Sequence, residues 1–346
     1  MGQGKKCQIQ LIICIFVRIC FIKNWFMKKP NLVYYVENFV RYTYPKSLCR
    51  LQTNRIFAKA EKRKDFNYIL DRVNYYNKLD DNFTPPHQYN FDNEIISVRG
   101  FKFFSMRNRG PSAYFFDTYE FVRFFPVANK FSFVFGDVTH IPSVPSIVKS
   151  RPVAGDNRNS IVLKLDKLRH FFFIKDRISF REKDNKIIFY ADMRDKPHRI
   201  GFMKKYFGHP ECICGDITGH ESIPKEWFVK KISIKEHLTH KFVLALEGND
   251  VATNLKWIMS SNCLAVMPKP KYETWFMEGL LIPDFHYVEI KDDYSDLIER
   301  MNYYIKNPAE AEKIIKNANE YISQFKNKRR EKIISLMVLR KYFNRN

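Results

Sequence analysis

The sequence has few acidic residues for its size. It contains 37 Asp or Glu against 59 Lys or Arg in 346 residues, so the formal net charge is +22 at pH 7. Such a surplus attracts negatively charged partners, including nucleic acids, anionic lipids and phosphorylated small molecules. The sequence carries neither zinc-finger spacing nor an aromatic-glycine RNA-binding motif. It therefore does not favour nucleic acid, and lipids and phosphorylated substrates remain.

Cysteine is also sparse and irregularly spaced. The seven positions are Cys7, Cys14, Cys20, Cys49, Cys212, Cys214 and Cys263. An odd number at irregular spacing argues against a disulfide framework and for a reducing compartment. In "HPECICGDITGH" (209–220) two histidines flank the cysteine pair, but no second pair completes a metal site. The Cys-Ile-Cys alternation is more typical of a buried strand, and we expect no bound metal.

No apolar run is long enough to span a membrane. The stretch "LIICIFVRICFI" has twelve residues and includes Arg18, whereas a spanning helix needs about twenty. It also lacks the small-residue cleavage site of a signal peptide. We expect residues 1–30 to form a non-cleaved basic and apolar segment, either outside the fold or at a membrane interface. Translation could instead start at Met27 rather than Met1.

The first half of the chain gives a mixed pattern. Aromatic and basic residues alternate in a mostly helical pattern over 31–80, a strand is expected at 93–104, and a helix at 112–126 ends at a proline. A second strand is expected at 130–137. The three prolines of 138–152 predict a loop.

The second half alternates between strand and helix patterns. Strands are expected at 186–192, 212–217, 241–248, 263–268 and 285–290, and helices at 196–208, 233–240, 249–261, 271–281, 294–307 and 308–325. Regular alternation over about 130 residues predicts a parallel sheet covered by helices. Ligands of such sheets bind beyond the carboxyl ends of the strands.

The stretch "EGNDVATN" (247–254) occupies such a strand end. Gly248 permits a tight turn, and the amides of 249–252, at the start of the expected helix, would face an anion. A simpler interpretation is that Asn249 or Asp250 caps the helix. One cap explains one polar residue rather than the whole group, so we favour a binding site.

Three segments together resemble glycosyltransferase family 90. They are "FVFGDVTHIPSVPSIVKSRPVAGDNRNSIVLKLDKLRH", "KFVLALEGNDVATNLKWIMSSNCLAVMPKPKYETWFMEGLLIPDFHYVEI" and the helix after the second. The resemblance covers roughly residues 90–325 and is greatest to the bacterial lipopolysaccharide core glycosyltransferases, relatives of the protein O-glucosyltransferases.

The resemblance implies an α/β fold of GT-B type, in which two Rossmann-like α/β domains face a cleft. It predicts an acceptor-side domain at 31–180, a nucleotide-sugar-binding domain at 181–322, and a basic C-terminal helix at 323–346 that crosses back to the first domain. Such enzymes are usually metal-independent, so neither a metal nor another cofactor is expected. Arg, Lys and backbone amides would then neutralise the diphosphate leaving group.

Asp137 in "FGDVTHIP" matches the acidic general base of the protein O-glucosyltransferases. A carboxylate that takes the proton of a sugar hydroxyl makes this poor nucleophile reactive. The alternatives are that His140 is the base, or that Asp137 closes a turn at a strand end.

The second motif is "YADMRDKPHRIGF" (190–202). Arg194 and Arg199 flank a turn into a helix, and guanidinium groups fit phosphate oxygens. Eukaryotic relatives have Gly-Ser where this chain has Asp192 and Met193, which puts the loop conformation in doubt. Either arginine could instead be a solvated surface charge.

The third motif is the strand-end stretch itself. By the family pattern it holds the phosphates and ribose of the nucleotide, and the candidates are Glu247, Gly248, Asn249, Asp250, Thr253 and Asn254. Eukaryotic members carry an arginine at the position of Asn254, so either Lys256 compensates or the diphosphate binds differently. Glu273 could accept hydrogen bonds from ribose, or be an exposed helix acid.

A polar turn precedes the expected domain crossover. Its residues are Gly155, Asp156, Asn157, Asn159 and Ser160. In the family this region lies near the cleft, and Ser160 could cap a helix. A plain linker turn is the alternative.

These observations predict an inverting transfer of a hexose from a UDP-sugar to a lipopolysaccharide core or a similar surface glycan. The enzyme is expected in the cytoplasm, peripheral to the inner membrane, where its charge meets anionic lipid. The alternatives are a protein O-glucosyltransferase or capsule xylosyltransferase, which would need export, and a non-catalytic binder of polyanions. The basic cluster Lys326, Lys328, Arg329 and Arg330 is a candidate lipid contact.

Overall fold

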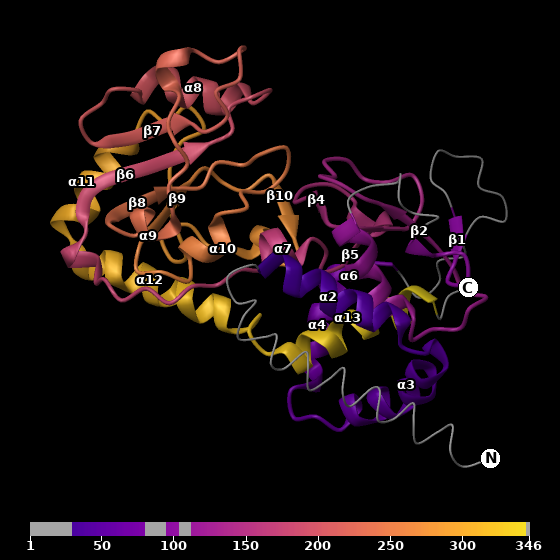
Figure 1. Cartoon of the computed structure of the whole chain (residues 1–346). Helices are drawn as coiled ribbons and strands as arrows, with labels where there is room; N and C mark the ends of the chain where they lie inside the picture. Colours follow the sequence, from indigo (N-terminus) through magenta and orange to yellow (C-terminus); the bar gives the residue numbers. More distant parts are fainter. Residues whose placement is uncertain (1–29, 80–94, 104–111, 344–346) are drawn as a thin grey trace.

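The computed structural model describes residues 30–79, 95–103 and 112–343 (Figure 1). The predictions for the segment at 1–30, apart from its last residue, and for a start at Met1 or Met27 lie outside the described residues. Within these ranges, no helix has the combination of length and apolar character that crossing a bilayer requires.

The first sheet has the strand order β1-β2-β3-β5. Its strands are β1 (Ile95–Ser97), β2 (Lys130–Val134), β3 (Ser146–Val148) and β5 (Ser160–Val162). β1 is antiparallel to β2, and β2, β3 and β5 run parallel. The β3 and β5 residues are all buried, as expected for strands that lie inside a parallel sheet.

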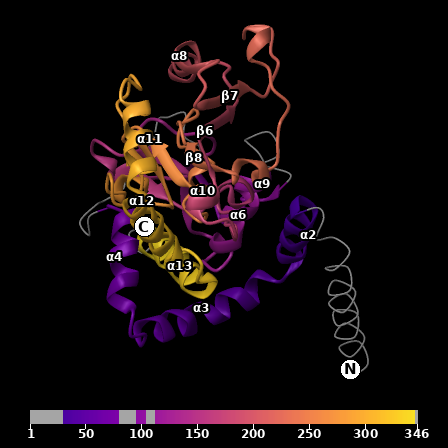
Figure 2. The same ribbon diagram turned by 90° about the vertical axis from the view of Figure 1, so that its left-hand side faces the viewer.

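Helices from both ends of the chain pack beside this sheet. They are α2 (Pro30–Thr43), α3 (Lys46–Glu61), α4 (Phe66–Tyr76), α6 (Ser112–Val122) and α13 (Lys328–Phe343). The C-terminal helix lies close to α4 (Figures 1 and 2), and Asn77 donates a hydrogen bond to the carbonyl of Val338. Tyr342 donates another to the carbonyl of Pro145 and accepts one from the amide of Ser132. These contacts join the last helix to the first sheet.

The second sheet has the order β11-β9-β8-β6-β7, and every pairing in it is parallel. Its strands are β6 (Asp184–Ala191), β7 (Cys212–Asp216), β8 (His240–Leu244), β9 (Leu264–Met267) and β11 (Val288–Glu289). The predicted parallel sheet is therefore confirmed. Cys212 and Cys214 lie buried in β7, as their alternation predicted.

The helices of this half are α8 (Pro197–Tyr206), α9 (Ile234–His237), α10 (Leu255–Ile258), α11 (Leu297–Lys306) and α12 (Pro308–Ser323). Proline occupies the first helical positions of α8 and α12, where its missing N–H costs nothing. The chain is thus of mixed α/β class. The GT-B arrangement and the predicted domain boundaries stay predictions.

A two-stranded antiparallel ladder joins the two halves. It pairs β4 (Ser150–Pro152) with β10 (Tyr272–Thr274). Arg151 and Glu273 face each other in it with side chains that are 0% and 2% exposed, and Nε lies 2.8 Å from Oε1. Tyr75 donates a further hydrogen bond to Glu273. A buried, hydrogen-bonded ion pair therefore holds the connection.

Two predicted helices are wrong. The helix predicted at 249–261 is shorter in the structure and consists of α10 alone. Before α10, the Asn254 side chain donates to the carbonyl of Leu244 (3.0 Å), and Asp250 forms an ion pair with Lys149. The helix at 271–281 is instead β10 followed by a 3-10 turn at Glu278–Leu280. Met277 has φ +57°, which an α-helix does not accommodate, and β4 supplies the strand partner.

The predicted loop at 138–152 is also wrong, since it contains β3 and β4. Pro145 immediately precedes β3, and Pro152 is the last residue of the two-stranded β4 ladder. At strand ends the missing N–H of proline is tolerated. Ser160, considered as a helix cap, is fully buried and begins β5. Both differences arise because whether a short segment forms a strand depends on pairing partners elsewhere in the sequence.

Candidate active site

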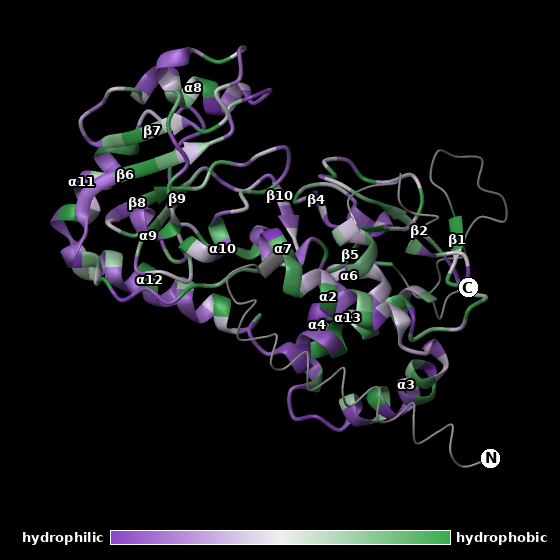
Figure 3. Ribbon diagram, viewed as in Figure 1, coloured by the Kyte–Doolittle hydropathy of each residue, from purple (hydrophilic) through white to green (hydrophobic). Residues whose placement is uncertain are grey.

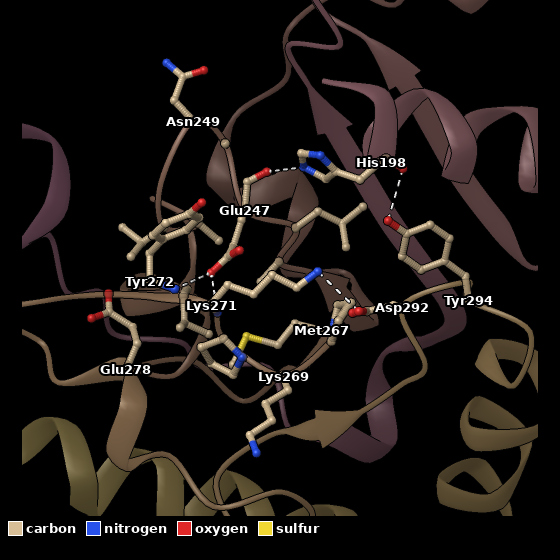
Figure 4. Close-up of a pocket in the computed structure, with 18 residues that line it drawn as sticks. His198, Glu247, Asn249, Met267, Lys269, Lys271, Tyr272, Glu278, Asp292 and Tyr294 are labelled. Carbon is tan, nitrogen blue, oxygen red and sulfur yellow. Dashed lines mark hydrogen bonds and ion pairs between the residues drawn. The ribbon is translucent and has the colours of Figure 1, made fainter. Parts of the chain in front are cut away.

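A cavity of about 330 Å³ lies beyond the carboxyl ends of β8 and β9 (Figure 4). Polar lining comes from the stretch after β8, the segment 269–278 after β9, two residues after β11, and His198 of α8. The polar and charged members of the lining are His198, Glu247, Asn249, Lys269, Lys271, Tyr272, Glu278, Asp292 and Tyr294. This is the edge at which parallel sheets bind ligands.

Arg199 braces the loop that follows β8. Its Nη2 and Nε donate to the carbonyls of Leu246 and Glu247, each at 2.9 Å, and its Nη1 donates to the carbonyl of Asp192. Burial lowers the pKa of Arg199 to about 10. His198 also contacts the Glu247 carbonyl at 2.8 Å. Arg199 is therefore not the solvated surface charge considered above, and much of its donor capacity is spent on the backbone.

Glu247 occupies one wall of the cavity. Its Oε1 accepts hydrogen bonds from the backbone amides of Lys271 (2.9 Å) and Tyr272 (3.1 Å). Burial raises the pKa of Glu247 to about 7, so its carboxyl group changes charge near neutral pH. Figure 4 shows this carboxyl group turned toward Lys271 and Tyr272, whereas the Asn249 side chain points away from them.

The Asn249 side chain reaches Asp137 in the other half of the chain. Asn249 Nδ2 donates to Asp137 Oδ2 at 3.0 Å. Lys149, between β3 and β4, pairs with Asp137 Oδ1 and with Asp250 Oδ2, the latter at 2.6 Å. The stretch after β8 therefore lines the cavity and, through Asn249, also contacts Asp137.

Lys149 is a buried cation between two carboxylates. Its side chain is 1% exposed, against 24% for Asp137 and 4% for Asp250. Burial disfavours the charged form of Asp137, but the hydrogen bond and charge of Lys149 outweigh it and lower the pKa. Burial raises the pKa of Asp250. Asp137 is thus ionised at neutral pH and is the more exposed of the two acids.

Several predicted residues lie away from the cavity. Glu273 is committed to Arg151, as described above. Lys256 is fully buried and its ammonium pairs with Glu278, so it does not reach the cavity to replace a cation at Asn254. The Asn254 side chain donates a hydrogen bond to the carbonyl at the end of β8. Thr253, the residue before it, is half-buried.

Arg194 and His140 are placed at the surface. The Arg194 guanidinium is 46% exposed and binds Asp192 through Nε and Nη2. This hydrogen bond lowers the pKa of Asp192 to about 2. His140 is exposed, three residues beyond Asp137. Nε and Nη2 each donate to Asp192, so the two hydrogens of Nη1 remain to contact a ligand without a change in the side chain.

The polar turn at 155–160 is held by internal contacts. Gly155 has φ +89°, a conformation that favours glycine. Asn157 Nδ2 donates to the carbonyl of Pro152 (2.8 Å), and Asn159 Nδ2 to that of Pro142 (3.0 Å). Asp156 is exposed and pairs with Arg158. These bonds account for the turn as a structural link.

Sequence reasoning missed two groups. Lys269 and Lys271 follow β9 directly and line the cavity, so their position after a predicted strand could have identified them. Lys271 pairs with Asp292 at 3.2 Å on an exposed surface. Lys149 carries no local signal, because only the fold reveals that it is buried between two acids.

The arrangement combines an ionised, partly exposed carboxylate with a polar cavity one loop away. Asp137 has spare lone pairs on both oxygens, since each accepts one bond in this structure. It can therefore accept a proton from a hydroxyl group. Among the described residues, no group of three His, Cys, Asp or Glu side chains is arranged to hold a metal ion.

Comparison with known proteins gives matches to a family model and to individual proteins. The family model for glycosyl transferase family 90 matches residues 170–342. An O-glucosyltransferase, LpsA, of Dichelobacter nodosus is 41% identical over 280 residues, which is 80% of this chain and 83% of the relative. The uncharacterized protein 179R of Invertebrate iridescent virus 6 is 28% identical over 116 residues, 32% of this chain and 10% of that protein.

Proposed function

The chain belongs to glycosyltransferase family 90, and we propose that it transfers a hexose from a UDP-sugar to a lipopolysaccharide core or similar glycan, with inversion. The hydrogen bond from Asn249 to Asp137 carries this proposal. It joins an ionised carboxylate to the loop that lines the cavity at the strand ends. The name of the Dichelobacter nodosus relative supports glucose as the hexose.

In the proposed reaction, the acceptor hydroxyl loses its proton to Asp137 as its oxygen attacks the anomeric carbon. The bond between that carbon and the diphosphate oxygen breaks, and UDP leaves from the opposite face. Lys269, Lys271 and the backbone amides of the cavity wall stabilise the negative charge of the leaving group. Lys149 holds Asp137 in its ionised form.

The donor occupies the cavity after β8 and β9 in this proposal. The acceptor approaches from the side of Asp137, with the two halves facing each other as in the GT-B type. No cofactor takes part. A lipid-anchored acceptor fits a basic enzyme on the cytoplasmic side of the inner membrane.

The experiment is release of UDP from a panel of UDP-sugars with a delipidated core acceptor. We expect one UDP-hexose to react fastest and UDP to raise the melting temperature more than tripolyphosphate does. Equal protection by both compounds, lost steeply with salt, would instead identify a non-catalytic polyanion binder.

A further inference from the structure

Helix α2 packs against α6 through polar side chains and through the rings of Tyr35 and Tyr42. Tyr34 donates to Asp117 Oδ1 (2.8 Å), and Arg41 lies 3.1 Å from Glu120 Oε2. Asn38 is the one buried side chain among residues 32–43 of this helix. This is the reverse of the usual surface helix, which buries its apolar side.

The apolar side of α2 faces outward. Its exposed members, spaced three or four residues apart, are Leu32, Tyr35, Val36, Phe39 and Val40. Phe39 is 62% exposed. An apolar groove of about 420 Å³ runs along this side, lined by Tyr35, Val36, Phe39, Val40, Tyr42, Phe103 and Phe116. A contiguous exposed apolar surface of this kind marks an interaction site.

Helix α3 extends the surface with exposed apolar and basic residues. Leu48 and Leu51 are 42% and 79% exposed. Arg55, Lys59 and Lys62 are exposed at the same helical spacing further along. Figure 3 shows hydrophobic and hydrophilic residues side by side along both helices. Leucine side chains beside cations are typical of helices that lie in a membrane interface.

The charge balance of this region selects among possible occupants. Residues 30–62 contain six Lys or Arg and two Glu, and one of these acids, Glu61, pairs with Arg340 at 3.0 Å. A second copy would bring like charges together. Residues 1–29 contain six Lys or Arg and no acid, so covering the surface with that segment would have the same effect. A negatively charged apolar partner fits better.

We propose that the outward side of α2, with Leu48, Leu51 and the basic residues of α3, docks on an anionic lipid bilayer. The apolar side chains enter the interface while Arg55, Lys59 and Lys62 meet lipid phosphates. Helix α3 lies on the opposite side of the molecule from α8 and β7 (Figures 1 and 2). The proposal does not depend on the proposed transfer reaction.

The test is co-flotation of the full chain with vesicles of phosphatidylcholine, with and without phosphatidylglycerol. We expect binding that requires phosphatidylglycerol. The double variant Phe39→Ser, Leu51→Ser should reduce partitioning about tenfold or more, since each change removes an apolar group from the interface. The triple variant Arg55→Gln, Lys59→Gln, Lys62→Gln should weaken binding and reduce its dependence on salt.

Matched variants separate this surface from others. Phe228→Ser removes a ring that is 50% exposed elsewhere and should leave partitioning unchanged. The variant Lys326→Gln, Lys328→Gln, Arg329→Gln tests the rival basic cluster at the start of α13. If this variant abolishes binding and the α2 and α3 variants retain it, the proposal is wrong.

Phe39→Trp gives a direct readout. The chain has four tryptophans of its own, so the readout is the emission of the variant minus that of the wild type. This difference should shift to shorter wavelength, and become quenchable by brominated lipid, only when anionic vesicles are added. A blue-shifted difference without vesicles would show that another part of the chain or a second copy already covers the surface, and would overturn the proposal. A concentration-dependent rise in mass, abolished by the same α2 variants, would assign the surface to a dimer and overturn the proposal.

Discussion

Asn249 donates a hydrogen bond to Asp137 across 112 positions of sequence. The bond joins the loop that follows β8 in the parallel second sheet to the turn that follows β2 in the first. Through it, the wall of the cavity and the candidate base form one unit with Lys149 and Asp250.

Asp137→Asn should abolish transfer and leave UDP binding nearly unchanged. The amide keeps the size of the carboxyl group but cannot take a proton, and loss of a general base costs on the order of 10²- to 10⁴-fold in rate. The measurement is turnover with the preferred UDP-sugar, with UDP titration as the control. A rate within about threefold of wild type would exclude Asp137 as the base, and His140→Asn would then be the variant to examine.

Lys149→Met should shift the acid side of the pH–rate profile to higher pH. The Lys149 ammonium keeps the pKa of Asp137 low, so its removal raises that pKa and more alkaline conditions are needed to ionise the base. The variant also leaves Asp250 buried without its partner, which costs about 3–5 kcal/mol of stability. Adding Asp250→Asn should restore much of the stability without restoring the profile. An unshifted profile would mean that Lys149 is purely structural.

The sequence was sufficient to predict the parallel sheet but not the contacts at its edge. β9 consists of apolar residues, and β8 ends in the apolar run 242–244, so local pattern identifies both strands. Glu273 and Lys256 were candidates because of their positions in the family motifs. Their burial depends on Arg151 and on Glu278, which approach only after folding.

The proline-rich stretch at 138–152 shows the same limit. Its prolines predicted a loop, so β3, β4 and the buried Lys149 that separates these two strands were not predicted. Short strands have little intrinsic preference, and their partners lie in other parts of the chain. Asp137 could be proposed as the base because a recognisable motif surrounds it, whereas no local feature marks Lys149.

Stability should respond to pH through Glu247. Burial raises its pKa in the folded protein to about 7 from an ordinary 4.5. Folding therefore favours the protonated form, and this contribution is fully present below about pH 4.5 and lost as the pH rises through about 7. The melting temperature of the wild type should fall relative to that of Glu247→Gln between pH 5 and pH 8. Parallel curves for the two proteins would contradict the assignment.

Turnover should continue in excess chelator. Positive side chains and backbone amides beside the cavity are proposed to neutralise the leaving diphosphate, so no divalent ion is needed. The measurement is UDP release after dialysis against EDTA, compared with release after adding back magnesium or manganese. Activity lost in chelator and restored by one of these ions would refute metal independence.

Glu273→Ala should reduce stability without changing donor affinity. Glu273 and Arg151 form a buried pair between β10 and β4, and removal of one partner leaves an uncompensated buried charge at a cost of about 3–5 kcal/mol. The control is Glu312→Ala, which breaks an exposed pair with Arg181 of similar length, 2.8 Å, and should leave the denaturation midpoint unchanged. Urea denaturation and UDP titration of both variants give the comparison. Normal stability with weakened UDP affinity in Glu273→Ala would contradict the structural role and would indicate instead that Glu273 accepts hydrogen bonds from the ribose.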